Sequence, residues 1–397
     1  MASWREQPGL DRLTAALGAE AELCRFVGGA VRDTLLGHAA ADLDVATSLP
    51  PDEVMRRIGA AGLKAVPTGL AHGTVTAVLP DGPVEVTTLR RDVETDGRHA
   101  RVAFTDNWRE DAARRDFTIN ALSAEPLSGA VHDYFAGLDD LAKGRVRFIG
   151  EAQARIAEDH LRILRFFRFH ARFGQGPADD EALAACAARA RDLQSLSRER
   201  IAQELLKLLA VADPVPTLAL MVGQAILAPV LPEIGPEGVA RLAQLTVREA
   251  ALAEADPIRR LAALLPLDPT LVDAVAARLR LSKAQRRRLV AAAAGAPGED
   301  ARLLAYGVGI ETARDRLLLH ASEAALAEGW ERLTGWVSPR LSLTGGDLIA
   351  LGLPRGPIVA ATLAMVEQRW AIEGFPPPDR TRSIAAEAVA QALGRDR

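Results

Sequence analysis

The sequence changes character near residue 150, and this change constrains the fold more than any other feature of the 397-residue chain. Before it, short runs of β-branched and apolar residues are separated by Gly, Pro and Asp, a pattern typical of strands joined by turns. From about residue 153 onward, Ala, Leu, Arg and Glu dominate, and apolar residues recur every three or four positions, which predicts helices. We therefore expect an α+β, multidomain protein with a mixed-sheet N-terminal part and an all-helical remainder.

The strand signals in the first part lie at residues 23–27, 42–47, 73–79, 84–89, 118–124 and 131–135. Helical signals lie between them at residues 31–36 and 51–61. Asp81-Gly82, between two strand signals, predicts a hairpin, because both residue types tolerate the backbone of a two-residue turn. We expect a head over residues 1–147, a helical neck over 148–215, and a helical body and tail over 216–397.

The charge balance excludes a chain that is basic throughout. Lys and Arg number 48 and Asp and Glu 52, so any surface that binds phosphate must be local. Two cysteines, Cys24 and Cys186, are too few for a disulfide framework or a four-cysteine zinc site, and they indicate a reducing compartment. No secretory signal follows Met1, and prolines interrupt the uncharged stretch 214–232. We expect a cytoplasmic protein without a membrane span or a disulfide-linked partner; the sequence does not indicate an oligomeric state.

Two aspartates, Asp42 and Asp44, lie two residues apart in a predicted strand. Strand alternation puts both carboxylates on one face, with their Cα atoms about 6.5 Å apart. Carboxylates so placed can share divalent cations, the arrangement that supports nucleotidyl transfer. Taken alone, the Asp-x-Asp pattern fits a solvated strand edge as well.

A glycine pair, Gly28-Gly29, joins a predicted strand to a predicted helix. Glycines let the backbone approach a ligand, the start of the helix offers unpaired N–H groups, and Arg32 lies one turn further on. The segment therefore indicates a binding site for a triphosphate. The alternative is a structural turn in which Arg32 pairs with Asp33.

Paired arginines precede an acid and an amide in the run from Arg114 to Asn120. Arg115 is placed to hold phosphate oxygens, and Asp116 and Asn120 to hydrogen-bond a ribose hydroxyl. The alternative is that the arginines pair with Glu110 and Asp111. Upstream, residues 90–102 are polar and lack periodicity, which predicts a mobile loop beside the site.

Residues 158–169 form a strongly helical pattern in which polar groups recur every three residues. Cytosine and adenine both present an exocyclic amine donor beside a ring-nitrogen acceptor, whereas uracil and guanine present the reverse. The carboxylate of Asp159 and the guanidinium of Arg162 match the first pattern. Arg165 and Arg168 are then free to hold a triphosphate. The alternative is an ion pair of Glu158 with Arg162 on a solvated helix face.

These motifs together resemble the class II CCA-adding tRNA nucleotidyltransferases, whose superfamily includes the bacterial poly(A) polymerases. The matching segments follow the family order and are residues 28–33, 42–44, 84–90, 114–120, 133–141 and 158–169. A looser match covers residues 343–353 in the tail. The resemblance implies a polymerase β-like nucleotidyltransferase head followed by a helical part that binds tRNA.

The resemblance also implies an activity and roles for the residues above. The family adds C, C and A to the 3′ end of tRNA from CTP and ATP without a nucleic-acid template, and releases pyrophosphate. Asp42 and Asp44 would hold two Mg²⁺ ions, with Mn²⁺ as the alternative metal. Asp159 and Arg162 would select the base. Glu85, on a strand that could adjoin the aspartates, is a candidate third carboxylate or simply an edge-strand charge.

Other functions remain open at this point. A poly(A) polymerase usually has a basic and aromatic stretch where this chain has residues 62–69, and a CC-adding enzyme lacks the loop that residues 91–102 supply. A catalytically dead RNA-binding protein would use the helical part alone, with residues 278–288 as its best basic candidate. Nucleotidyl transfer to a small molecule would leave the helical part without a role.

Overall fold

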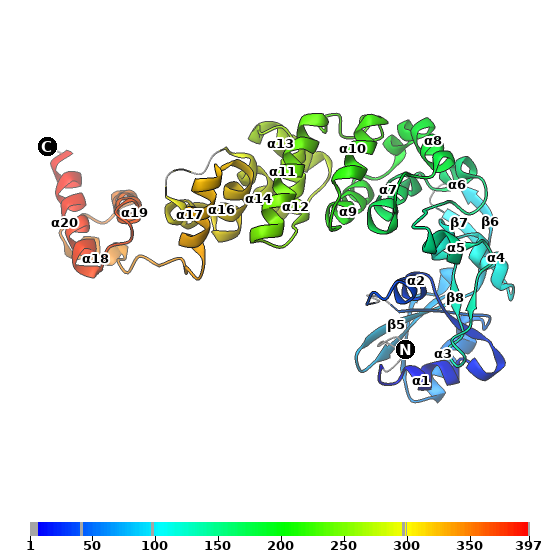
Figure 1. Cartoon of the computed structure of the whole chain (residues 1–397). Coiled ribbons are helices and arrows are strands. Elements are labelled where there is room, and N and C mark those ends of the chain that lie inside the picture. Colours follow the sequence, from blue (N-terminus) through cyan, green and yellow to red (C-terminus); the bar gives the residue numbers. More distant parts are fainter. Residues whose placement is uncertain (1–6, 40–42, 97–98, 296–297, 299, 396–397) are drawn as a thin grey trace. The chain divides into compact units, whose positions relative to one another are not determined.

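The computed structural model describes residues 7–39, 43–96, 99–295, 298 and 300–395, of which residues 92–96, 99–102 and 395 are described by their backbone. These residues divide into two compact units, residues 1–232 and 233–397 (Figure 1). The first unit contains a mixed sheet and the helices that follow it, and the second is helical. The predicted fold class is confirmed. The finer division into head, neck, body and tail stays a prediction.

Seven strands of the described chain form one sheet, in the order β3-β4-β5-β2-β1-β8-β9. Their bounds are β1 Cys24–Val27, β2 Asp44–Thr47, β3 Lys64–Gly69, β4 Thr74–Leu79, β5 Gly82–Thr88, β8 Ser123–Ala124 and β9 Val131–His132. Neighbouring strands are antiparallel except β2 and β5, which are parallel. The predicted hairpin joins β4 to β5, where Leu79 pairs with Gly82 and the φ of Gly82 is 138°.

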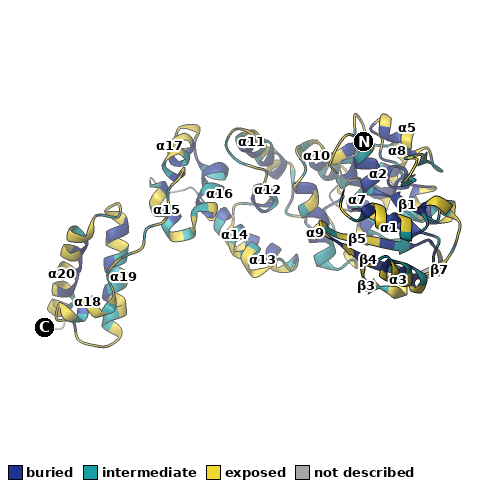
Figure 2. Cartoon of the chain, turned by 90° about the horizontal axis from the view of Figure 1, so that it is seen from below, coloured by how far each residue is buried: buried dark blue, intermediate teal, exposed yellow. Residues whose placement is uncertain are grey.

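One face of the sheet is buried. Val84 and Val86 of β5 are fully buried, and Glu85 between them is exposed on the opposite face. Helix α3 (Pro51–Ala60) contacts β3, β4 and β5, and its buried Val54 and Ile58 supply the covering side chains. Figure 2 shows β1 as buried, whereas α3 alternates between buried and exposed positions. The other face of β2 and β5 is left for the site described below.

Helices complete the first unit. They are α1 Leu10–Ala16, α2 Gly29–Leu35, α4 Trp108–Ala113, α5 Gly137–Ala142, α6 Ala152–Glu158, α7 Leu161–Phe173, α8 Asp180–Ala188, α9 Arg198–Leu209 and α10 Val215–Gly223. An aromatic cluster holds α7 to the segment after α4. The ring of Phe117 lies 4.9 Å from Phe148 and 5.2 Å from Phe169, between centroids. This packing fixes α7 beside the segment that carries Asp116 and Asn120.

Three expectations about secondary structure are wrong. Residues 118–124, β-branched at the start, form a short 3₁₀ helix at Thr118–Asn120 and only then β8, because the Asp116 and Asn120 side chains are drawn inward by hydrogen bonds. Residues 90–102 form a two-stranded ladder in the described chain, β6 Arg90–Asp96 with β7 His99–Phe104. The predicted strands also omit β3, a half-exposed edge strand with a register shift between Val66 and Gly69.

The second unit is built from helices α11 Pro236–Leu252, α12 Pro257–Leu264, α13 Pro269–Arg278, α14 Lys283–Ala293, α15 Ala301–Val308, α16 Ile310–His320, α17 Glu323–Leu333, α18 Gly345–Ala350, α19 Pro357–Ile372 and α20 Pro378–Arg395. Buried charges join four of them. Glu249 of α11 accepts from Arg259 and Arg260 at 2.8 and 2.7 Å, and Asp315 of α16 accepts from Arg259 and Arg288 at 2.7 Å. Each buried charge is therefore paired.

Three arginines of the basic stretch at residues 278–288 have acidic partners. Arg278 is bound by Glu233 at 2.6 Å, Arg286 by Asp273 at 2.5 Å and Arg288 by the buried Asp315. The first two pairs are partly exposed, so the role of this stretch in RNA binding stays a prediction. No helix within the described residues is long and apolar enough to cross a membrane.

Candidate active site

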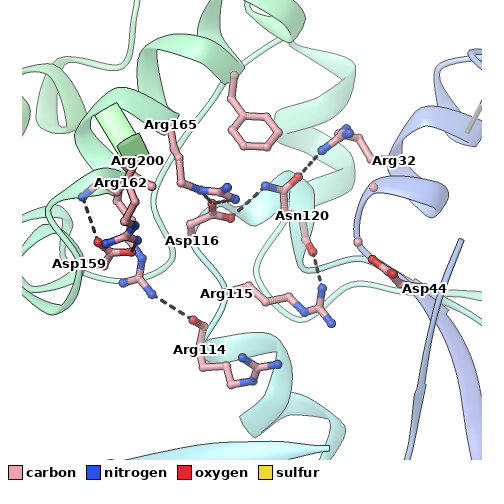
Figure 3. Close-up of a pocket in the computed structure, with 14 residues that line it drawn as sticks. Arg32, Asp44, Arg114, Arg115, Asp116, Asn120, Asp159, Arg162, Arg165 and Arg200 are labelled. Atoms are coloured by element: carbon pink, nitrogen blue, oxygen red, sulfur yellow. Dashed lines mark hydrogen bonds and ion pairs between the residues drawn. The ribbon is translucent and has the colours of Figure 1, made fainter. Parts of the chain in front are cut away.

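A cavity of about 600 Å³ in the first unit brings most of the predicted residues together (Figure 3). It lies between the glycine turn, the segment after α4 and the start of α7. Its lining residues are Gly28, Gly29, Arg32, Asp44, Arg114, Arg115, Asp116, Asn120, Asp159, Leu161, Arg162, Arg165, Phe169 and Arg200. Six arginines in one cavity create a strongly positive site, although the whole chain is slightly acidic.

The glycine turn has the backbone that the sequence predicts. Gly28 has φ 67° and ψ −127°, a conformation that side chains rarely adopt, and a Cβ there would lie 3.0 Å from the guanidinium of Arg115. Helix α2 begins at Gly29, and Arg32 lies in its first turn. The Arg32 side chain donates to Asp33 at 2.8 Å and to the side-chain oxygen of Asn120. Arg32 thus pairs with Asp33 and also lines the cavity, so both arrangements considered from the sequence are observed.

Asp116 is the hydrogen-bonded centre of the cavity wall. Its Oδ1 accepts from the backbone N–H of Phe117 and from Asn120 Nδ2, each at 2.9 Å, and its Oδ2 accepts from Arg165 Nε at 2.7 Å. Asn120 in turn accepts from Arg32. This chain of contacts fixes the orientation of the Asn120 amide and links the glycine turn to α7.

The charge of Asp116 matters for stability. Burial alone would raise the pKa of the Asp116 carboxyl, but the charge of Arg165 and the hydrogen bonds from Asn120, Arg165 and Phe117 outweigh it and lower the pKa. A lowered pKa stabilises the fold above the unfolded pKa, about 3.9 for Asp, and this contribution is lost as the pH falls through the folded pKa.

We expect Asp116→Asn to lower the free energy of unfolding by about 1.5–3 kcal/mol at pH 7, because Arg165 loses its charged acceptor. The difference between wild type and variant should begin to shrink below about pH 3.9, where Asp116 of the unfolded chain takes up a proton, and should be lost as the pH falls through the lowered folded pKa. Urea denaturation at pH 7 and at pH 3.5 measures both values. A difference that grows on acidification would contradict the assignment.

Two carboxylates lie side by side at the edge of the cavity. Asp44 begins β2 and lines the cavity, and the pairing of β2 with β5 places Glu85 directly opposite it, on the same face. Both residues are exposed. Asp42 lies outside the described residues. Among the residues that the structure does describe, no group of three His, Cys, Asp or Glu side chains could hold a metal ion.

The predicted continuous helix over 158–169 is wrong, because the chain leaves the helical conformation at Asp159. Helix α6 ends at Glu158, Asp159 has φ −152° and ψ 107°, and α7 begins at Leu161. The Asp159 Oδ1 accepts from the backbone N–H of Leu161 at 3.1 Å, and its Oδ2 accepts from Arg200 of α9 at 2.7 Å. The carboxylate still lines the cavity, near Arg162.

Arg162 lies against the protein instead of in solvent. Its guanidinium donates to the Glu158 carboxylate, to the carbonyl of Arg155 at 2.8 Å and to the carbonyl of Arg114 at 3.3 Å. Its side chain is 14% exposed. The ion pair with Glu158 that the sequence suggests is therefore present, but on a cavity wall and not on a solvated face.

Arg165 and Arg168 are not free, contrary to expectation. Arg165 is bound by Asp116, and Arg168 donates to Glu204 of α9 at 2.7 Å and is not among the lining residues. Both guanidinium groups also contact the ring of Phe169, at 5.4 and 4.3 Å from its centroid. The expected role of the two arginines in binding triphosphate stays a prediction.

Sequence reasoning missed four of the lining residues: Arg114, Leu161, Phe169 and Arg200. The alternative considered for Arg114, pairing with an acid, is observed: it donates to Asp111 at 2.9 Å while also lining the cavity. Arg200 follows Asp159 by 41 residues. No local pattern joins them, so only the packing of α9 on α7 reveals the contact.

Comparison with known proteins identifies the family. Residues 24–147 match the family model for the poly(A) polymerase head domain, and residues 179–236 match the model for a probable RNA- and SrmB-binding site of polymerase A. The human mitochondrial CCA tRNA nucleotidyltransferase 1 is 34% identical over 391 residues, which cover 92% of this chain and 87% of the relative. The chain belongs to the CCA tRNA nucleotidyltransferase family.

Two further similarities support this assignment. The CCA-adding enzyme of Oceanobacillus iheyensis is 45% identical over 185 residues, which cover 46% of this chain and 45% of that enzyme. The crystal structure of the Bacillus stearothermophilus CCA-adding enzyme in complex with CTP has a TM-score of 0.75 and 26% identity, over 97% of this chain and 98% of that one. The resemblance seen in the sequence is confirmed. Membership of this nucleotidyltransferase family implies the use of a divalent metal.

Proposed function

We propose that this CCA tRNA nucleotidyltransferase adds C, C and A to the 3′ end of tRNA, with CTP and ATP as substrates. The full-length similarity to a named CCA tRNA nucleotidyltransferase carries the proposal, and the arginine-lined cavity beside paired carboxylates supports it. The terminal 3′ hydroxyl attacks the α-phosphorus of the nucleotide, a new phosphodiester forms, and pyrophosphate leaves.

Each part of the cavity has a proposed role. Arg32, Arg115 and Arg165 hold phosphate oxygens, for which planar guanidinium groups are suited. Asp116 and Asn120, held by their hydrogen bonds, contact the ribose. Asp159 and Arg162 read the amine donor and the ring-nitrogen acceptor that cytosine and adenine share. Arg200 keeps the Asp159 carboxylate oriented while no base is bound.

The donor set of the site suits Mg²⁺, with Mn²⁺ as the alternative, because it consists of carboxylate oxygens at the edge of a phosphate cavity. We propose that Asp42 and Asp44 hold the metal ions, with Glu85, opposite Asp44, as the candidate third ligand. Bound there, the metal would neutralise the triphosphate and lower the pKa of the attacking hydroxyl. The side chains of the cavity contribute to the reaction by orienting the nucleotide.

The proposed compartment is the cytoplasm. Cys24 and Cys186 are both buried and free of disulfides, as expected in a reducing compartment. Burial raises the pKa of the Cys24 thiol to about 12, which makes it a poor nucleophile.

The experiment uses a tRNA transcript that ends at the nucleotide before the tail. With labelled CTP alone we expect two additions, and with CTP and ATP three, each resolved on a sequencing gel. A long ladder from ATP alone would indicate a poly(A) polymerase, and arrest after two additions with both nucleotides a CC-adding enzyme. A chain that binds the transcript without extending it would be an RNA-binding protein.

A further inference from the structure

The sheet face that carries Asp44 continues into a group of aromatic side chains. Ala46 lies two residues after Asp44 in β2, so it shares that face at about 6.5 Å along the strand. Trp108, the first residue of α4, packs against a buried cluster of Val27, Ala46 and Leu89. Its indole therefore covers the part of the sheet next to the catalytic carboxylate, and it is itself partly exposed.

Arg25 holds this indole in place. It lies opposite Ala46 in the pairing of β1 with β2, and its guanidinium carbon is 4.3 Å from the centroid of the Trp108 ring. Arg25 is 6% exposed and also donates to the Tyr134 hydroxyl at 3.1 Å. A buried cation stacked on an indole fixes the orientation of the ring.

A second arginine and aromatic pair lies next to the first. The guanidinium of Arg109 is 5.5 Å from the centroid of the Phe135 ring. Arg109 is exposed, and Tyr134 and Phe135 are half-buried. We call Trp108, Arg109, Tyr134 and Phe135 the aromatic platform. Half-exposed rings beside an exposed positive charge are the combination that binds single-stranded nucleic acids, through base stacking and phosphate contact.

Helix α4 connects the platform to the nucleotide cavity. Trp108 and Arg109 begin this six-residue helix, and Arg114 and Arg115, which line the cavity, follow its end. The helix spans about 9 Å. The cavity adjoins Asp44 at the start of β2, whereas Trp108 covers Ala46 further along the strand. When the incoming nucleotide occupies the cavity, the surface around Trp108 stays open. It is therefore available to the RNA strand that supplies the attacking hydroxyl.

We propose that Trp108 is the stacking surface for the terminal base of the acceptor RNA strand. This inference rests on the proposed function. The terminal base changes during the reaction, because each added nucleotide becomes the next acceptor. The subsite must therefore hold a base without reading its edge. Stacking on an indole does so, since every base has an aromatic face.

The test compares two acceptors: a tRNA with a normal terminal nucleotide, and one whose terminal residue lacks its base but keeps the 3′ hydroxyl. For wild type, loss of the base should lower kcat/KM for the acceptor by about 5- to 100-fold. Trp108→Leu, which keeps apolar contact with the sheet, should lower kcat/KM for the normal acceptor by a similar factor and show little further loss with the abasic one. KM for CTP should stay unchanged.

Trp330→Leu is the matched control, because Trp330 also lies under an arginine, Arg314, at 5.0 Å, but in the second unit. It should keep the full response to the abasic acceptor. An equal response in wild type and Trp108→Leu, or no response in wild type, would overturn the proposal.

A second measurement tests the proposal even if the Trp108→Leu variant does not fold. 2-Aminopurine as the terminal base should lose fluorescence on binding to wild type and to Trp108→Phe, and unquenched fluorescence with wild type would also overturn the proposal. Wild type that fails to extend the normal acceptor would instead contradict the proposed function.

Discussion

Replacement of Asp44 by Asn is expected to lower the rate of nucleotide addition on the order of 1000-fold, with little change in tRNA affinity. The substitution keeps the size of the side chain and removes the charge that we propose holds a divalent cation. Asp44 is exposed at the cavity edge, so the fold should tolerate the change. Single-turnover rates of CTP addition, tRNA binding by fluorescence anisotropy and the Tm together measure the effect.

Asp42→Asn should lower the rate to a similar extent. Glu85→Gln tests whether Glu85 is a third metal ligand or only a charge on an edge strand. A ligand at position 85 would make this variant lose much of the rate, whereas an edge-strand charge would leave the rate unchanged. Asp81→Asn, in the turn between β4 and β5 of the same sheet, is the matched control and should retain full activity. Turnover retained in Asp44→Asn would refute the metal assignment.

Asp159→Asn should change which nucleotide the enzyme accepts. In the proposed site, the carboxylate accepts from the amine of cytosine or adenine, whereas an amide can also donate to the carbonyl of uracil. We expect kcat/KM for CTP and ATP to fall about 10- to 100-fold, and the preference for CTP over UTP to fall at least as much. Asn can still accept from the Leu161 N–H, so the start of α7 should survive.

Steady-state kinetics with all four nucleotides and one acceptor check this result. Asp179→Asn is the control, since Asp179 also caps a helix, accepting from Ala182 at 3.1 Å, but lies outside the cavity. Its nucleotide preference should equal that of wild type. An unaltered ratio of CTP to UTP in Asp159→Asn would remove Asp159 from base selection.

Much of the fold could be predicted because local signals agree with it. The Asp81-Gly82 turn predicts a hairpin, and alternation along β5 separates Val84 and Val86 from Glu85. The ladder over β6 and β7 could not be predicted, because its polar residues lack the alternation of a half-buried strand. The register of Asp44 opposite Glu85 also depends on a parallel pairing between segments 41 residues apart, which no local pattern specifies.

The site was predicted where its residues lie close together in the sequence. Gly28, Arg32, Arg115, Asp116 and Asn120 come from two short motifs and do meet in one cavity. The partners of Arg165 and Arg168 could not be predicted from the sequence. Arginines that appear free in the sequence are bound to acids, Arg165 by Asp116 and Arg168 by Glu204, because a buried guanidinium without an anion is costly.

The interruption between α6 and α7 gives Asp159 two duties that a continuous helix would have separated. One carboxylate oxygen starts the helix that carries Arg162, and the other faces the cavity, where Arg200 holds it. On the proposed assignment, a substitution that removes both oxygens would weaken the start of α7 together with base selection. Asparagine keeps an oxygen for the Leu161 N–H, so it is the substitution that could alter base selection while α7 keeps its start.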